Sequence, residues 1–455
     1  MMRVNLQKIS YSLIIACIIW FPYQDLCLSF VYRHFPSPLL KIGLVGKELC
    51  ILAALIILWV RKALHGRHFS GQHAELVSYV LVTFCILYVF VTQLLAADVP
   101  FFTVATSFRS SILPIMLFLA GFWLSPTLPQ VQFILKTIIL ISVVNVLIGF
   151  FETIVPVSVF WNGTLDLYGY LSNIKGLQTG TGREGGFINL VPGNFWAFVG
   201  LRRMAGGIAS PLALGYYLVL PIVIAASQLK ILKNQNIIIL LLVIGLLLTQ
   251  TRAAVIATLI GIFGYYLTRK SLFRLKINKR WLLVLVSCVS VILILTSIPI
   301  VRDFLISTVT AKESSAAGHS EAWEQSLQSV RETLVVGKGF GLAGGWAATQ
   351  TGSSAAGECA YLSLMYQVGG LGLVIFLSWW LMIVMGILRK RKRTANKYLR
   401  ELYLSVLFIN IAYMFTGLFS DQLFTFTSIG HFWLLDGMLL SLDNTTMHQV
   451  GLQIL

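Results

Sequence analysis

Four arginines with the chemistry of an anion site lie near the middle of this 455-residue chain. They are Arg183, Arg202, Arg203 and Arg252. The first three belong to one glycine-rich stretch, and the fourth interrupts the apolar run 236–267. The planar guanidinium offers five N–H donors that match phosphate or carboxylate oxygens, and a pyrophosphate can engage two guanidiniums at once. We therefore expect an anion-binding site; for any single arginine, contact with lipid headgroups or with Glu184 is the alternative.

Further groups that could take part in chemistry lie later in the chain. Glu358 directly precedes an apolar segment, where partial desolvation can raise the pKa of a carboxyl and make it a general base; an ordinary exposed glutamate is the alternative. His319 and Glu321 are candidate groups for positioning an acceptor, or ordinary loop residues. The glycine-rich element 337–341 resembles a phosphate loop only weakly, because the flanking strand and the Lys-Ser/Thr pair are missing.

The elements that must position these residues are apolar helices. The run 236–267 is too long for one span of about 20 residues, so we predict two spans joined at residues 249–252. Arg252 then lies at a membrane face. Because a charge at membrane depth costs roughly 2.5 to 3.5 kcal/mol, such an arginine commonly faces a polar cavity or marks a function.

The composition predicts an all-α polytopic membrane protein, since 57% of the residues are hydrophobic and only 11% are charged. Windows of about 20 residues give about twelve transmembrane helices. They are expected near residues 9–30, 42–60, 76–97, 105–124, 133–155, 208–227, 236–250, 253–267, 281–300, 359–388, 401–419 and 428–443. The first of these is longer than a signal-peptide core and is expected to be retained.

The basic residues predict a topology. The net charge of +17 comes from short Lys and Arg clusters between apolar runs, which indicates membrane lipid as a partner and gives no reason to expect nucleic acid. With both termini in the cytoplasm, the clusters near residues 61–62, 230–233, 269–280 and 389–400 all lie inside. Two long polar loops, 156–207 and 301–358, then lie outside. They divide the chain into an N-terminal scaffold (1–155), central helices (208–300) and C-terminal helices (359–455). Arg109, near the outer end of the fourth span, is a further candidate.

The outer loops contain one predicted helix and show no sign of a metal site. Apolar residues from Ser320 to Leu334 recur at helical spacing and predict an amphipathic helix. Neither an Asp-x-Asp pair nor a histidine cluster occurs in the loops, so we expect no metal and no cofactor.

Five short segments follow one another from residue 203 onwards. They are Arg203-Met204-Ala205-Gly206 leading to Ser210-Pro211, Thr251-Arg252-Ala253-Ala254, Gly318-His319 with Trp323, Gly337 to Gly341, and Glu358-Cys359-Ala360-Tyr361-Leu362 leading to Gly369-Gly370-Leu371-Gly372. In order and topology they resemble segments of the bacterial O-antigen polymerase and O-antigen ligase superfamily. This chain departs from that pattern at His319, where the family has arginine, and at Glu358, where it has histidine.

The resemblance implies a GT-C-like, metal-independent, inverting glycosyltransferase. Such proteins act at the periplasmic face of the bacterial inner membrane on oligosaccharides linked to undecaprenyl pyrophosphate, as donor and acceptor, and a chain-length regulator is a further expected partner. Ligases of the family use the histidine that Glu358 replaces, so polymerase is favoured. On this reading Arg252 and Arg203 stabilise the pyrophosphate and Glu358 is the base. The expected substrate-binding residues are Arg202, Arg183, His319, Glu321 and Tyr361.

Two alternatives remain open. An O-antigen ligase or a protein O-oligosaccharyltransferase would share the fold and the donor and differ only in the acceptor. A transporter or lipid flippase would use Arg252 and Arg203 as anion-binding charges on a translocation path.

Overall fold

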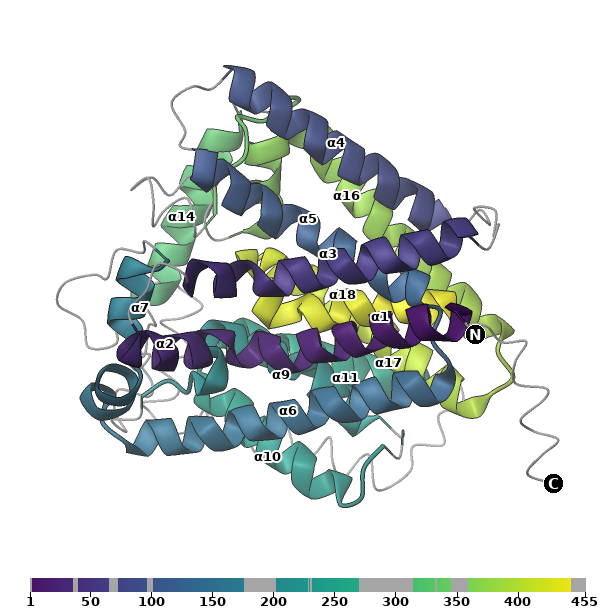
Figure 1. The fold of residues 1–455 in the computed structure, drawn as a ribbon, viewed down its shortest axis with the longest axis horizontal. Helices are drawn as coiled ribbons and strands as arrows, with labels where there is room; N and C mark the ends of the chain where they lie inside the picture. The colour runs from purple at the N-terminus through teal and green to yellow at the C-terminus, as the bar shows by residue number, and fades with distance from the viewer. Residues whose placement is uncertain are drawn as a thin grey trace.

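The computed structural model describes residues 2–35, 40–64, 73–95, 101–175, 202–227, 229, 231–269, 314–331, 334–344 and 359–442. Within these residues every regular element is helical, as the composition predicts. Most of the long helices run side by side as a bundle, with α4 and α16 along one edge of the view (Figure 1).

The N-terminal half forms six α-helices and a short 3-10 helix. They are α1 (Met2–Trp20), η1 (Phe21–Tyr23), α2 (Gln24–His34), α3 (Leu40–Leu64), α4 (His73–Leu95), α5 (Phe101–Leu124) and α6 (Leu128–Ile154). The predicted span 9–30 lies within the helical segment Leu6–His34, which is long and apolar enough to cross a membrane. Pro22 accounts for the 3-10 turn η1 inside this segment, because proline lacks the backbone N–H that an α-helix requires.

The rest of the described chain is also helical. It forms η2 (Ser158–Thr164), α7 (Leu167–Asn173), η4 (Gly206–Ile208), α9 (Pro211–Ala226), α10 (Gln235–Leu248), α11 (Arg252–Arg269), α14 (Ser314–Arg331), α16 (Ala360–Arg393), α17 (Lys397–Thr416), η5 (Asp421–Phe424) and α18 (Phe426–Ser441). The amphipathic helix expected over 320–334 is α14, which begins and ends earlier in the chain than predicted.

In the described part of the chain, six helical segments are long and apolar enough to cross a membrane, which makes the protein a multi-pass membrane protein. They are Leu6–His34, Gly43–Leu64, Thr103–Leu124, Leu128–Ile154, Ala360–Arg393 and Lys397–Thr416. Other predicted spans coincide with shorter apolar helices, such as α9 with 16 residues and α10 with 14. The predicted span 281–300 lies outside the described residues, and the number of twelve stays a prediction.

Helix α18 lies at the centre of the core. All of its residues from Ser428 to Leu440 are buried, and its indole ring of Trp433 packs against those of Trp379 and Trp380 of α16. Its contact with α5 is close because glycines face each other there. A Cβ at Gly437 would lie 2.0 Å from the carbonyl oxygen of Phe118, so only glycine permits this approach.

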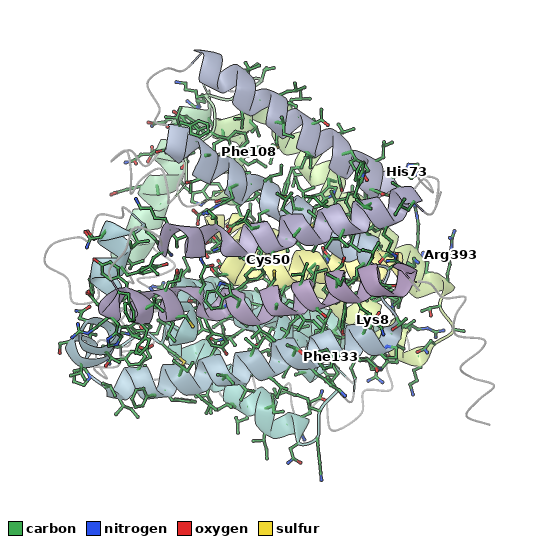
Figure 2. The ribbon with its side chains drawn as sticks, in the orientation of Figure 1. Lys8, Cys50, His73, Phe108, Phe133 and Arg393 are labelled. Atoms are coloured by element: carbon green, nitrogen blue, oxygen red, sulfur yellow. The ribbon has the colours of Figure 1, made fainter. Side chains whose placement is uncertain are left out.

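The two ends of the bundle carry different parts of the chain. Helices α7 and α14, from the two predicted outer loops, lie at the same end (Figure 1). Lys8, His73 and Arg393 lie at the opposite end (Figure 2). This separation is what the topology predicted from the basic clusters requires.

Candidate anion-binding site

The junction between α10 and α11 is the first part of the site. Helix α10 ends at Leu248 and α11 begins at Arg252, which confirms the prediction that the long apolar run forms two helices. The turn between them contains buried Thr249 and Thr251, and Gln250 adopts a left-handed φ of 55°. Arg252 is exposed at the first turn of α11, where the N-terminal end of the helix dipole adds positive potential.

Residues 202–205, here called the arginine loop, form the second part. Arg203 donates from Nε to the carbonyl oxygen of Thr249 at 3.0 Å and from Nη2 to Oγ1 of Thr251 at 3.3 Å. The backbone N–H of Met204 donates to the carbonyl oxygen of Leu248 at 2.9 Å. The loop is therefore fixed to the α10–α11 junction, and Arg203 lies next to the turn that leads to Arg252.

The two arginines affect each other electrostatically. Burial, together with the nearby charge of Arg252, lowers the pKa of Arg203 to about 10. Among the described residues no carboxylate forms an ion pair with Arg203. A bound anion would offset both the burial of one charge and the repulsion between the two. The geometry thus supports anion binding at this position.

Glu152, near the end of α6, binds the backbone at the end of the arginine loop. It was not among the site residues predicted from the sequence. Its carboxylate is 1% exposed and accepts hydrogen bonds from the N–H of Ala205 at 2.6 Å and of Gly206 at 3.4 Å. It also accepts from Nε1 of Trp161 at 2.8 Å. A lone carboxylate inside a predicted span is the signal that could have identified it, because such groups need a specific partner.

Arg202 acts mainly as a cap of α6. Its Nη2 donates to the carbonyl oxygens of Glu152, Thr153 and Val155, which the helix end leaves without intrahelical partners. Its Nη1 is buried and has no hydrogen-bond partner among the described residues. The predicted role of Arg202 in anion binding therefore depends on this second nitrogen alone.

The other predicted site residues are not brought to Arg203 by any described contact. Glu358 and Arg183 lie outside the described residues. His319 and Glu321 belong to α14, where Glu321 is exposed. Tyr361 donates to the carbonyl oxygen of Met414 at 2.6 Å and so ties α16 to α17, which is a structural contact.

The element Gly337–Gly341 has a structural role in the described chain. Gly369 has a φ of 75° and kinks α16, and the carbonyl oxygens that this kink releases accept from the N–H groups of Lys338 at 2.8 Å and Gly339 at 3.0 Å. Phe340 is fully buried against the ring of Phe108. These backbone amides are thus used within the protein, in agreement with the weak phosphate-loop signal.

Comparison with protein-family models finds no match, and comparison with curated proteins finds none either. In the described part of the chain no group of three or more His, Cys, Asp or Glu side chains is placed to hold a metal ion. What the site offers is positive charge and N–H donors at one end of a helical bundle.

Proposed function

We propose that the protein is a membrane glycosyltransferase that polymerises a surface glycan. It would transfer a growing glycan from undecaprenyl pyrophosphate to a lipid-linked repeat unit at the periplasmic face of the bacterial inner membrane. The observation that carries this proposal is the proximity of Arg203 and Arg252, which gives two cationic groups at the end of a bundle of apolar helices. The five segments that resemble the O-antigen polymerase and ligase superfamily support it, because two of them supply these arginines.

The proposed reaction is a single displacement at a sugar carbon. A hydroxyl at the non-reducing end of the acceptor repeat attacks the anomeric carbon of the donor glycan and forms a new glycosidic bond. The bond from that carbon to the pyrophosphate oxygen breaks, its electron pair leaves with undecaprenyl pyrophosphate, and the configuration inverts. The hydroxyl proton passes to a base, for which Glu358 is the candidate from the sequence.

The arginine pair would lower the barrier of this step. Negative charge grows on the departing pyrophosphate, and donors already aimed at that position stabilise it without reorganisation. Removing one such donor costs on the order of 100- to 1,000-fold in rate. The N-terminal end of α11 adds to the same field.

The GT-C-like fold, the twelve spans, the cytoplasmic termini and the periplasmic position of the site belong to the same proposal. They are supported by the position of α7 and α14 at the end of the bundle opposite to Lys8 and Arg393 (Figures 1 and 2). With this orientation the predicted basic clusters face the cytoplasm, as the positive-inside rule requires.

The size distribution of surface polysaccharide on a gel tests the proposal. A strain that lacks this gene should show single repeat units in place of a ladder, and the wild-type gene should restore the ladder. Arg252→Ala should not restore it, whereas Arg269→Ala, at the other end of the same helix, should. Bare lipid core in the deletion strain would indicate a ligase instead, and an unchanged ladder would indicate another glycan, a protein acceptor or transport.

A further inference from the structure

A second group of charged side chains lies in the N-terminal half, which the proposed function has not used. Lys47 and Glu48 belong to α3 and Arg109 to α5, and we call these three residues the Glu48 cluster. Arg109 Nη1 lies 3.4 Å and Lys47 Nζ 4.0 Å from Oε1 of Glu48. The side chains of Lys47 and Glu48 are only 14% and 17% exposed.

The carboxylate of Glu48 is the group of this cluster whose hydrogen-bonding capacity is unused within the described chain. Both carboxylate oxygens of Glu48 are buried and have no hydrogen-bond partner there, although Arg109 and Lys47 are close by. Charges that are removed from water are tolerated when further hydrogen bonds satisfy their remaining donors and acceptors. The cluster therefore offers an acceptor, Glu48, between two donors, and a ligand with hydroxyl groups would complete it.

The charges around the cluster favour a neutral polar ligand over a second pyrophosphate. Asp25 and Lys175 interact with the charge of Lys47, and these two residues form an ion pair at 2.7 Å. Together the five groups contain three cations and two carboxylates, so little net positive charge remains. Sugar hydroxyls both donate and accept hydrogen bonds, which suits a carboxylate between two cations. Phe426, whose ring lies 5.9 Å from Lys47 Nζ, adds an apolar surface.

The cluster is connected to the arginine loop through a short path. Lys175 follows α7 and binds Asp25 of α2, and two residues before Asp25 the ring of Tyr23 packs against Gly207 of η4. A Cβ at Gly207 would lie 2.7 Å from this ring, so the packing is tight. Gly207 lies two residues beyond the end of the arginine loop. The packing of Tyr23 of η1 against Gly207 of η4 thus links the two charged groups.

We propose that the Glu48 cluster is a sugar-hydroxyl subsite that binds the acceptor end of the lipid-linked repeat. Glu48 accepts hydrogen bonds from the hydroxyls of one sugar ring, and Lys47 and Arg109 donate to its oxygens. This inference rests on the proposed glycosyltransferase function, and it assigns donor pyrophosphate and acceptor sugar to separate groups of residues.

Two soluble probes separate the subsite from the pyrophosphate site. One is the free oligosaccharide that mild acid releases from the lipid-linked repeat of a strain lacking this gene, and the other is inorganic pyrophosphate. Binding of each is measured with the purified full-length protein in lipid nanodiscs. Glu48→Gln should weaken oligosaccharide binding about tenfold or more, because a hydrogen bond to a charged group is lost, and leave pyrophosphate binding unchanged.

Glu401→Gln is the matched control, since Glu401 is 15% exposed and paired with an arginine, Arg269, in α11. It should change neither binding constant. Arg252→Ala should weaken only pyrophosphate binding. The inference is overturned if wild-type protein does not bind the oligosaccharide, if folded Glu48→Gln and Arg109→Gln both bind it normally, or if Glu48→Gln weakens both probes equally. One further outcome distinguishes the two proposals. If oligosaccharide binding depends on Glu48 but pyrophosphate binding does not depend on Arg252, the sugar subsite is supported and the proposed leaving-group site is contradicted.

Discussion

Arg203 donates from Nε to the carbonyl oxygen of Thr249, 3.0 Å away, in the turn that leads to Arg252. This contact joins two segments that are well separated in the sequence. It also explains why the charge of Arg252 is felt at Arg203.

Arg203 should be needed for chain elongation. Arg203→Ala removes one preorganised donor, so the elongation rate should fall on the order of 100- to 1,000-fold. Arg203→Lys keeps the charge and loses the planar fork, and we expect an intermediate rate. The measurement is the initial rate with purified lipid-linked repeats at equal protein amounts. Wild-type rates for both variants would remove Arg203 from the mechanism.

The elongation rate should fall as the pH rises through about 10. Burial and the charge of Arg252 lower the pKa of Arg203 to about 10, so the guanidinium loses its proton there and no longer attracts the pyrophosphate. Arg203→Lys should move this decline to lower pH, because an unperturbed lysine has a pKa of about 10.4 and the same two causes lower it further.

Rising pH affects the stability of the protein through Arg203 in the opposite direction to the elongation rate. Above pH 10 the folded protein binds fewer protons at this residue than the unfolded chain, in which the pKa of the arginine is not lowered. The free energy of unfolding that Arg203 contributes therefore rises with pH in this window. Circular dichroism recorded alongside the rates distinguishes loss of the charge from unfolding. A pH profile identical in wild type and Arg203→Lys would contradict the assignment.

Glu152→Ala should destabilise the arginine loop. The N–H groups of Ala205 and Gly206 and the indole N–H of Trp161 would lose their acceptor, and each buried donor left without a partner costs about 1 to 3 kcal/mol. The melting temperature should fall and elongation should slow. Glu324→Gln, on the exposed face of α14, is the control and should melt like wild type. Equal melting temperatures for both variants would show that Glu152 does not hold the loop.

Gly369→Ala should lower the free energy of unfolding by about 2 kcal/mol or more, since strained backbone conformations cost about 1 to 3 kcal/mol before any steric clash. Gly369 has a φ of 75°, and a Cβ there would lie 2.2 Å from the carbonyl oxygen of Val335. Gly46→Ala is the control, because nothing lies within 4 Å of a Cβ at that position in α3. Thermal unfolding in lipid nanodiscs compares the two. A Gly369→Ala protein as stable as Gly46→Ala would contradict the role of the kink.

Much of the helical layout could be predicted from the sequence, because length and hydropathy define apolar helices directly. The break before Arg252 is one example. The first predicted span is confirmed as one helical segment, but the 3-10 turn η1 inside it was not predicted, although Pro22 marks it. The sequence predicted an amphipathic helix in this region, and Val330 of α14 is buried, yet Leu327 is 47% exposed. In a membrane protein apolar side chains face lipid as well as the core, so hydropathy does not predict burial.

The site was less predictable because its contacts join distant segments. The proximity of Arg203 and Arg252 was expected only from a family resemblance, and no periodicity or spacing indicates it. Glu152 and Glu48 each occur as a single carboxylate in an apolar helix. Their partners, the arginine loop and Arg109 of α5, become known only from the packing of the helices.

Release of undecaprenyl pyrophosphate by the purified protein tests the central claim most directly. The protein is supplied with lipid-linked repeats, and both the released lipid pyrophosphate and the glycan length are followed. Wild type and Arg269→Ala should release one lipid pyrophosphate for each repeat added, and Arg252→Ala should be slower on the order of 100- to 1,000-fold. Elongation by Arg252→Ala at the wild-type rate, or no release by wild type, would contradict the account.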